Sequence, residues 1–254
     1  MNNFINNQRL SQIAGVNFDS EKIQPGGIVY SRTHTVKKQF KRLASFPSCV
    51  LITSFSDDCC TDEMADKLPS NVRRWFSNNV MTDNPRVTEV PIGIPYSDKE
   101  KPLRKVMEEG RNPQHNLVYM NFIRKIHRPI NPRQGLYEMF ENKSWVTTEG
   151  GNDHVSPLQF FNQIASHPFI LSPPGAGPDC HRHWEALYLG SIPIVKRSPV
   201  TKILNDLPCL QIDSWDEVTE ERLLKELPEL QKRFNDSAMD KIWFEYWQKQ
   251  ILEA

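Results

Sequence analysis

The chain has 254 residues, with 31 Lys or Arg and 31 Asp or Glu, so its formal net charge is zero. This balance gives no global positive field to attract nucleic acid or an anionic membrane. A hydrophobic content of 38%, with 13 Phe and 6 Trp, argues against disorder and is enough for one large domain or two small ones.

The N-terminal segment, MNNFINNQRLSQIAG, lacks the apolar stretch of a signal peptide, and no run approaches the roughly 18 apolar residues of a transmembrane helix. The five cysteines are odd in number and irregularly spaced, unlike a disulfide framework. These features predict a cytoplasmic protein with reduced thiols and no transmembrane segment. The run 180–183, Cys-His-Arg-His, has no second ligand pair at a familiar zinc spacing, so no metal is expected there.

Apolar runs alternate with amphipathic segments in the first part of the chain, which predicts a parallel α/β sheet. Strands are expected at 27–30, 49–53 and 87–92, and helices at 35–44 and 70–79. Polar residues, including Asp57 and Asp58, directly follow the strand at 49–53. Open α/β sheets bind ligands at this end of their strands.

The charged segment 97–115, with two prolines and one glycine, is expected to link two domains at 1–112 and 113–254. Beyond it the alternation resumes. Strands are expected at 117–120, 145–147, 169–171, 192–195 and 209–212, and helices at 131–140, 156–164 and 239–251, with a further helical region from 213 that Pro228 should interrupt.

The segment 169–195, FILSPPGAGPDCHRHWEALYLGSIPIV, predicts a strand, a tight loop, a helix and a second strand. Pro178 suits the first turn of the helix, Asp179 complements its dipole, and Gly190 stops it. A loop of small residues that leads into a helix exposes unpaired backbone N–H groups. Such a loop favours a phosphate or diphosphate.

Three polar side chains of the predicted helix can converge on one surface, because His181 and Glu185 are four residues apart and Arg182 and Glu185 are three apart. The alternative is an ordinary ion pair between Arg182 and Glu185 on a solvated helix. The spacing fits both interpretations equally well.

This segment resembles the C-terminal donor-binding motif of exostosin-like glycosyltransferases. That motif combines a strand, a Ser-Pro-Gly loop, an Arg, a Glu-Ala pair and Gly-x-Ile-Pro. The segments 75–79, 91–94 and 117–122 are also similar to parts of bacterial proteins in this group. The resemblance covers roughly residues 27–250 in outline, and only 169–195 is specific.

The resemblance implies an α/β GT-B fold, in which two Rossmann-like domains with parallel sheets face a cleft. Residues 1–112 would then form the acceptor-side domain and 113–254 the nucleotide-sugar-binding domain, with a last helix that is able to pack back on the first. It also implies sugar transfer from a nucleotide-sugar, with UDP favoured, to a glycan or lipid-linked glycan acceptor, as in polysaccharide biosynthesis. Peripheral contact with a membrane is compatible with this role.

Carried over position by position, the resemblance implies that Glu185 binds the ribose and Arg182 neutralises the diphosphate. The loop and the start of the helix would face the diphosphate through Ser172, Pro174, Gly175, Ala176, Gly177, Asp179 and His181. Weaker candidates for the same charge are Lys125, Arg128 and Arg133.

No Asp-x-Asp motif is present, so we expect the enzyme to work without a metal or other cofactor. The first domain is short for this fold. Gly177 stands eight positions before Glu185, where some retaining families have a second glutamate. An inverting transfer is therefore favoured, and it needs a base. Asp57 is the first candidate, followed by Asp58 and His34, although acidic residues after strands are commonly helix caps or solvated.

Three other functions fit parts of the pattern. A fucosyltransferase-like enzyme that uses a GDP-sugar has a similar donor domain, and a nucleotide-binding or glycan-binding module would keep the loop without a working base. A dinucleotide oxidoreductase is disfavoured, because residues 175–177 supply only the beginning of Gly-x-Gly-x-x-Gly.

Overall fold

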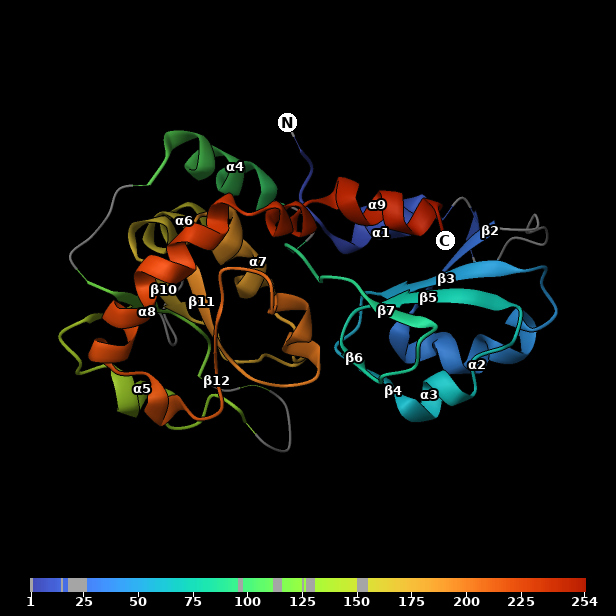
Figure 1. The fold of residues 1–254 in the computed structure, drawn as a ribbon, viewed down its shortest axis with the longest axis horizontal. Coiled ribbons are helices and arrows are strands. Elements are labelled where there is room, and N and C mark those ends of the chain that lie inside the picture. The colour runs from blue at the N-terminus through green and yellow to red at the C-terminus, as the bar shows by residue number, and fades with distance from the viewer. Residues whose placement is uncertain are drawn as a thin grey trace.

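The computed structural model describes residues 2–14, 16–17, 27–95, 98–111, 116–124, 126, 131–149 and 155–254. These residues form two five-stranded parallel sheets that lie side by side, together with a short two-stranded sheet (Figure 1). The predicted α/β fold class with two parallel sheets is confirmed by this topology, and residues from both halves of the chain line the pocket described below.

The first sheet has the strand order β1-β2-β3-β5-β7, and its central strand β3 is buried along its whole length. Its strands are β1 (Val16–Asn17), β2 (Gly27–Arg32), β3 (Cys49–Ser54), β5 (Val72–Ser77) and β7 (Val87–Glu89). Beside them are α1 (Asn7–Ile13), α2 (Thr33–Leu43), α3 (Asp62–Asp66) and the small sheet of β4 (Cys60–Thr61) and β6 (Val80–Met81).

The second sheet has the order β12-β11-β10-β8-β9. Its strands are β8 (Val118–Met120), β9 (Val146–Thr148), β10 (Phe169–Leu171), β11 (Ile192–Lys196) and β12 (Leu210–Ile212). The α-helices from this part of the chain are α4 (Glu100–Glu109), α5 (Leu136–Phe140), α6 (Pro157–Ser166), α7 (His181–Tyr188), α8 (Glu220–Lys232) and α9 (Phe244–Leu252). The described residues of this part also form the 3-10 helices η1 (Val200–Leu204), η2 (Trp215–Glu217), η3 (Arg233–Asn235) and η4 (Ser237–Ile242).

Helices cover both faces of each sheet. In the first sheet, α2 and α3 pack on one face, and α1 and α9 pack on the other (Figure 1). In the second, α4, α6 and α7 lie on one face, with α5 and α8 on the other. Because each face is covered, central strands such as β3 and β10 are continuous apolar runs, which is why the sequence predicts them.

The chain passes from the first sheet toward the second through residues 90–95 and returns near Trp243, and the last helix then packs on the first sheet through Phe244, Trp247 and Ile251. The N-terminal segment reinforces this crossing. Phe4 pairs with Trp243 in a β-bridge, and the Phe244 N–H donates to the Asn3 carbonyl over 3.0 Å.

One predicted helix is wrong. Residues 70–79 form strand β5, which pairs with β3 and β7. The spacing of Val72, Trp75 and Phe76 fits a helical face, but the same apolar side chains suit a central strand that is buried on both sides. Trp75 faces α2 and Phe76 faces α9, so the two neighbours point to opposite faces of the sheet.

Helix boundaries and breaks also differ from the predictions. Helix α7 begins at His181 with Cys180 as its N-cap, so Pro178 and Asp179 precede it. The predicted helix at 131–140 starts only at Leu136, after a turn. Pro228 does not interrupt α8, because the carbonyl that it leaves unpaired belongs to Leu224, a residue 53% exposed to water.

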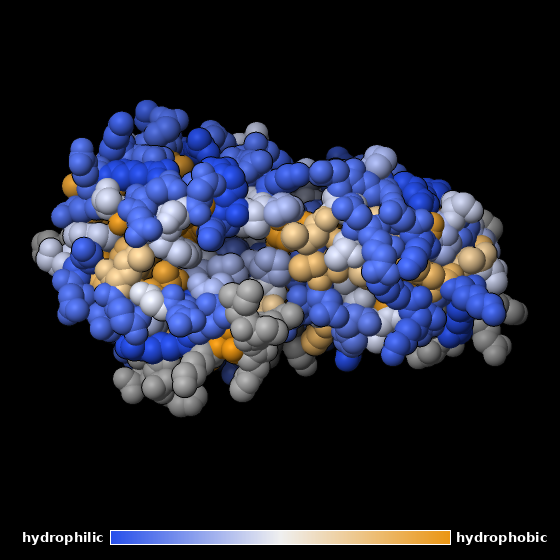
Figure 2. Space-filling model, turned by 90° about the horizontal axis from the view of Figure 1, so that it is seen from below, coloured by the Kyte–Doolittle hydropathy of each residue, from blue (hydrophilic) through white to orange (hydrophobic). Residues whose placement is uncertain are grey.

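Among the described residues, no helix combines the length and the apolarity that a bilayer crossing requires. The face in Figure 2 is mostly hydrophilic, with apolar residues in separate small groups over both lobes.

Gly93, in the crossing segment, has a φ of +65°, and a Cβ there would lie 2.1 Å from the Ile5 carbonyl oxygen. We expect Gly93→Ala to lower the free energy of unfolding by about 2–4 kcal/mol, through left-handed strain and overpacking together. The matched control is Gly110→Ala, where φ is +78° but no atom lies within 4 Å. The control should lose only about 1 kcal/mol. Equal losses in urea unfolding would contradict the tight packing of the N-terminal segment on Gly93.

Candidate functional site

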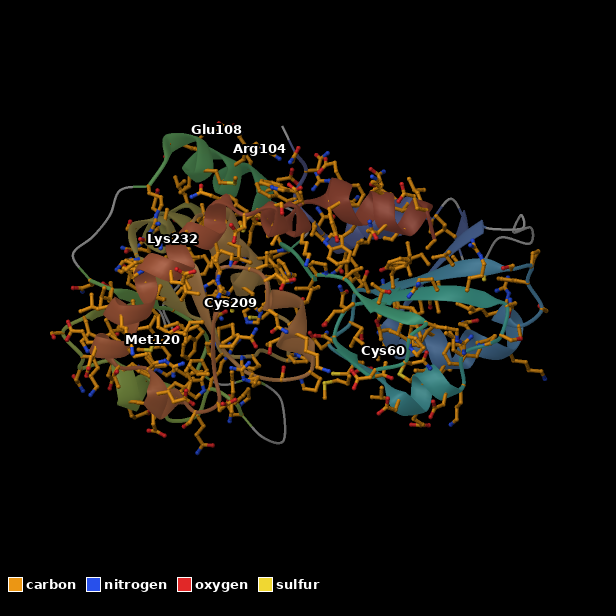
Figure 3. All side chains as sticks on the ribbon, viewed as in Figure 1. Cys60, Arg104, Glu108, Met120, Cys209 and Lys232 are labelled. Atoms are coloured by element: carbon orange, nitrogen blue, oxygen red, sulfur yellow. The ribbon has the colours of Figure 1, made fainter. Side chains whose placement is uncertain are left out.

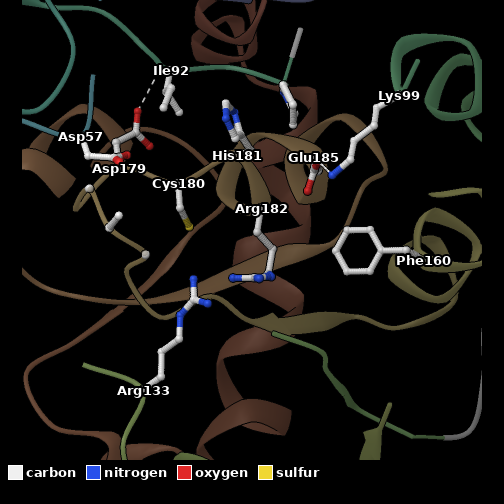
Figure 4. Close-up of a pocket in the computed structure, with 14 residues that line it drawn as sticks. Asp57, Ile92, Lys99, Arg133, Phe160, Asp179, Cys180, His181, Arg182 and Glu185 are labelled. Carbon is white, nitrogen blue, oxygen red and sulfur yellow. Dashed lines mark hydrogen bonds and ion pairs between the residues drawn. The ribbon is translucent and has the colours of Figure 1, made fainter. Parts of the chain in front are cut away.

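A pocket of about 270 Å³ lies between the two sheets, and both halves of the chain line it (Figure 4). Its position at the carboxyl ends of β3 and β10 is where open parallel sheets bind ligands. The first half and the crossing segment contribute Asp57, Ile92, Pro95 and Lys99. The second contributes Arg133, Phe160, Gly175, Ala176, Gly177, Asp179, Cys180, His181, Arg182 and Glu185.

The loop after β10 approaches the first half closely at Gly177. A Cβ there would lie 3.1 Å from Asn79 Nδ2 and 3.4 Å from the Asp57 Cα. Gly175 similarly allows Arg133 to approach, since a Cβ would lie 3.2 Å from Arg133 Nη2. The two glycines therefore let this loop pack against the Asp57 loop on one side and a buried arginine on the other.

Two other predicted loop residues have supporting positions. Pro174 accepts a hydrogen bond at its carbonyl from Arg133 Nε over 2.9 Å, which orients that guanidinium. Ser172 is fully buried and extends the sheet, its N–H donating to the Ile194 carbonyl over 2.9 Å. Neither residue lines the pocket, whereas Gly175, Ala176 and Gly177 do.

Asp179 is buried and connects the two halves of the chain through hydrogen bonds. Its Oδ2 accepts from the Ile92 N–H over 2.8 Å, and its Oδ1 accepts from Trp184 Nε1 over 2.8 Å and faces His183 Nδ1 at 3.3 Å. Its own N–H donates to Asn79 Oδ1 over 2.9 Å. Both carboxylate oxygens are thus engaged within the protein, so Asp179 connects the two halves of the chain, and it also lines the pocket.

Arg182 and Glu185, in contrast to Asp179, have buried polar atoms without hydrogen-bond partners in the described part of the chain. Among the described residues, no hydrogen bond reaches Arg182 Nε, Arg182 Nη1 or Glu185 Oε1, and all three atoms are buried. Lys99 Nζ lies 4.0 Å from Glu185 Oε1, beyond hydrogen-bond length. The alternative prediction, an ion pair between Arg182 and Glu185, is not found between these two described residues. Buried polar groups without partners are costly, so these atoms point to a ligand that satisfies them.

Two guanidinium groups stand together beside the loop. Arg133 and Arg182 lie 5.6 Å and 5.7 Å from the centre of the Phe122 ring. Burial, with the nearby charge of Arg182, lowers the pKa of Arg133 to about 10, so it stays cationic at neutral pH. Two buried like charges favour an anion between them.

His181 is held in one tautomer. Its Nδ1 lies 2.7 Å from the carbonyl oxygen of Gly93, which can only accept a hydrogen bond, so Nδ1 carries the proton. In the neutral ring Nε2 then keeps its lone pair. The pocket therefore holds a second proton acceptor besides the carboxylate of Asp57.

The structure places the remaining predicted site residues differently. Asp57 lines the pocket, but Asp58 and His34 are exposed and do not. Lys125 and Arg128 lie outside the described residues. Sequence reasoning missed Lys99, which lies in the predicted linker, and also Phe160 and Asn79, whose contacts join distant parts of the chain. No local pattern marks these three.

The residues that the structure describes contain no group of three or more His, Cys, Asp or Glu side chains placed to hold a metal ion.

No family model matches the chain, and no curated protein matches it in sequence. Solved structures with a similar course of the backbone include a glycosyltransferase from Rickettsia africae ESF-5, at 12% identity and a TM-score of 0.48, over 89% of this chain and 75% of that one. The pneumococcal O-GlcNAc transferase GtfA in complex with UDP and GlcNAc has 11% identity and a TM-score of 0.38, over 93% of this chain and 55% of that one. A GtfA/B complex has 11% identity and a TM-score of 0.36, over 91% and 54%. The chain therefore spans about half the length of GtfA.

The contrast between the two buried carboxylates can be measured. We expect Asp179→Asn to destabilise the protein by on the order of 3 kcal/mol, because it leaves a buried ion pair broken. Glu185→Gln should leave stability within about 0.5 kcal/mol or raise it, because no internal hydrogen bond of Oε1 is lost. Urea unfolding of the two variants checks this. A large loss for Glu185→Gln would mean that its carboxylate is structural.

Proposed function

We propose that the chain is a glycosyltransferase that moves a sugar from a nucleotide-sugar, with a UDP-sugar favoured, to a glycan acceptor. The observation that supports this most strongly is that Arg182 Nε, Arg182 Nη1 and Glu185 Oε1 are buried without hydrogen-bond partners among the described residues, beside a pocket between two parallel sheets. A cation and a carboxylate side by side suit a ligand that has both an anionic group and hydroxyl donors. A nucleoside diphosphate has both.

This geometry supports a specific proposal for donor binding. Arg182 and Arg133 would neutralise the diphosphate, and the backbone of Gly175–Gly177 would approach it closely. Glu185 would accept hydrogen bonds from the ribose hydroxyls. Lys99, 37% exposed at the rim, adds a further positive charge.

Transfer requires the acceptor hydroxyl to lose its proton as it attacks the anomeric carbon. We assign this proton to Asp57, which reaches the pocket from the opposite half to the arginines. The leaving diphosphate would then be stabilised by fixed cations. A base on one side and the leaving group on the other fit inversion.

In this proposal residues 1–112 form the acceptor side and 113–254 the donor side. The resemblance to exostosin-like enzymes supports a glycan or lipid-linked glycan acceptor and a role in polysaccharide biosynthesis. The proposed location is cytoplasmic.

A nucleotide screen tests the function. We expect UDP to raise the thermal unfolding midpoint, with affinity reduced at least tenfold in Glu185→Gln, because hydrogen bonds to a charged acceptor contribute about 1.5–3 kcal/mol. Hydrolysis or transfer from the corresponding sugar donors should follow. Stabilisation by GDP in place of UDP would favour the fucosyltransferase-like alternative. Binding without turnover would favour a non-catalytic module, and stabilisation by NAD alone would overturn the proposal.

The base assignment is tested by Asp57→Asn, which keeps the size of the side chain and removes its basicity. We expect kcat to fall by about 10²–10⁴ while UDP affinity is unchanged. Asp58→Asn is the matched control, since Asp58 does not line the pocket. If Asp57→Asn retains turnover, His181 Nε2 is the next acceptor to replace.

Metal independence is a separate expectation. Turnover should be unchanged by EDTA, because Arg182, Arg133 and Lys99 supply the positive charge that a divalent ion provides elsewhere. Loss of activity in EDTA, with recovery on adding Mg²⁺, would contradict this mechanism.

A further inference from the structure

Phe55, the first residue after β3, has a left-handed backbone conformation with a φ of +61°. Bulky residues rarely adopt this conformation, because the Cβ then lies too close to the following carbonyl oxygen. Burial does not offset the strain, since Phe55 is 44% exposed to water. Strain of this kind persists where the surrounding structure holds it, and it gathers at functional sites. The loop that begins at Phe55 is therefore a candidate for a role beyond folding.

Asn79 holds this loop in place. It is fully buried, and with a φ of +52° it is the other left-handed residue besides glycines in the described part of the chain. Its Nδ2 donates to the Ser56 carbonyl over 3.4 Å, and its Oδ1 accepts from the Asp179 N–H over 2.9 Å. Its own carbonyl accepts from the N–H of Cys60, at the start of β4, over 2.9 Å (Figure 3). The loop is thus fixed against both halves of the chain, while Phe55 stays at the surface.

Arg32 lies beside the ring of Phe55. Its guanidinium carbon is 5.5 Å from the ring centroid. The two residues lie at the same edge of the sheet, because Arg32 ends β2 and is paired with Ser54, the last residue of β3. Both residues are exposed. Together they offer a flat apolar ring, whose face is electron-rich, next to several N–H donors.

This combination matches the chemistry of a pyranose. A face of such a sugar ring carries axial C–H groups, which are apolar and weakly positive and pack on the electron-rich face of an aromatic ring. The hydroxyl groups at its edge accept hydrogen bonds from a guanidinium. A phosphate or a carboxylate would use Arg32 alone and leave the exposed ring of Phe55 without a function. The pair therefore favours a sugar over a simple anion.

The position of Phe55 connects this surface to the pocket. Asp57 lies two residues further along the loop and lines the pocket (Figure 4). Two residues of chain span at most about 7 Å, so a glycan stacked on Phe55 can bring a hydroxyl of the same or the next sugar to Asp57. Neither Phe55 nor Arg32 lines the pocket that we propose to hold the donor, so the two surfaces are distinct.

We propose that Phe55 and Arg32 form a sugar-binding site, in which the ring stacks on the apolar face of a pyranose and the guanidinium donates to its hydroxyls. This sugar belongs to the acceptor, and that assignment rests on the proposed function, because it takes Asp57 as the base. The binding of the sugar does not depend on a donor.

The strain at Phe55 is tested by two substitutions that both remove the ring. Phe55→Gly relieves the left-handed conformation, whereas Phe55→Ala keeps it. We expect the thermal unfolding midpoint of Phe55→Gly to lie about 2–4 °C above that of Phe55→Ala. Equal midpoints would contradict the strained conformation, and with it the assignment of this loop.

Sugar binding is tested by saturation-transfer difference NMR on the intact protein with methyl β-D-glucopyranoside, while the aromatic protons are irradiated. In this glycoside H1, H3 and H5 point to one face of the ring, and H2 and H4 point to the other. We expect one set to receive more saturation than the other, because a single face lies on the aromatic ring. Equal saturation of both faces, or none at all, would overturn the proposal.

Matched variants identify the residues involved. Phe55→Leu keeps an apolar side chain without the flat ring and should raise the dissociation constant of the glycoside about three- to tenfold. Phe55→Tyr keeps the ring and should bind as the unmodified protein does. Arg32→Gln should raise the constant by at least about twofold, whereas Lys38→Gln, which removes another exposed charge from α2, should leave it unchanged. An unchanged constant in Phe55→Leu would contradict the stacking.

The same variants separate this site from the donor site. UDP should stabilise Phe55→Leu as much as the unmodified protein. If UDP does not bind but the glycoside stacks, the donor proposal fails and the sugar site stands. If UDP binds but glycoside binding does not depend on Phe55, the sugar site is wrong and the donor proposal stands. If Phe55→Leu instead weakens binding to vesicles of phosphatidylcholine and phosphatidylglycerol, with glycoside binding unchanged, the ring is a membrane contact and the proposal is overturned.

Discussion

The arrangement of this protein depends on one buried carboxylate. Asp179 accepts hydrogen bonds from Ile92, in the segment that crosses between the sheets, and from Trp184, on α7, while its own N–H donates to Asn79. Because a buried carboxylate is stable only when its oxygens are paired, these contacts fix the loop after β10 against the first half of the chain. The carboxyl ends of the two sheets are thereby held around a common pocket.

These contacts of Asp179 also determine what the pocket can bind. With Asp179 and His183 committed to each other, the start of α7 directs Arg182 and Glu185 at the cavity with atoms that no described residue satisfies. A protein tolerates such atoms at a site where a ligand completes them. The difference between a satisfied and an unsatisfied carboxylate, six residues apart on one segment, separates the structural group from the group that we propose to bind donor.

The local sequence predicted the fold class and the elements of the segment 169–195. The strand, loop, helix and strand of 169–195 follow from apolar runs and turn residues, and the fold class follows from their alternation along the chain. Strand β5 was predicted as a helix, because the spacing of Val72, Trp75 and Phe76 fits both structures. The contacts that Asp179 makes within the protein were not predicted, for another reason. Its partners Ile92 and Asn79 stand 87 and 100 residues away, and no periodicity indicates such contacts. The same limit applies to the first half of the site, where Asp57, the first candidate, lines the pocket while the other two candidates, Asp58 and His34, do not.

The central claim is that the buried atoms of Arg182 and Glu185 that lack hydrogen-bond partners among the described residues bind the nucleotide. A crystal structure of the protein with UDP tests it most directly. We expect diphosphate oxygens within hydrogen-bond distance of Arg182 Nε or Nη1, and ribose hydroxyls on Glu185 Oε1. UDP bound elsewhere, with these three atoms still lacking partners, would contradict the claim.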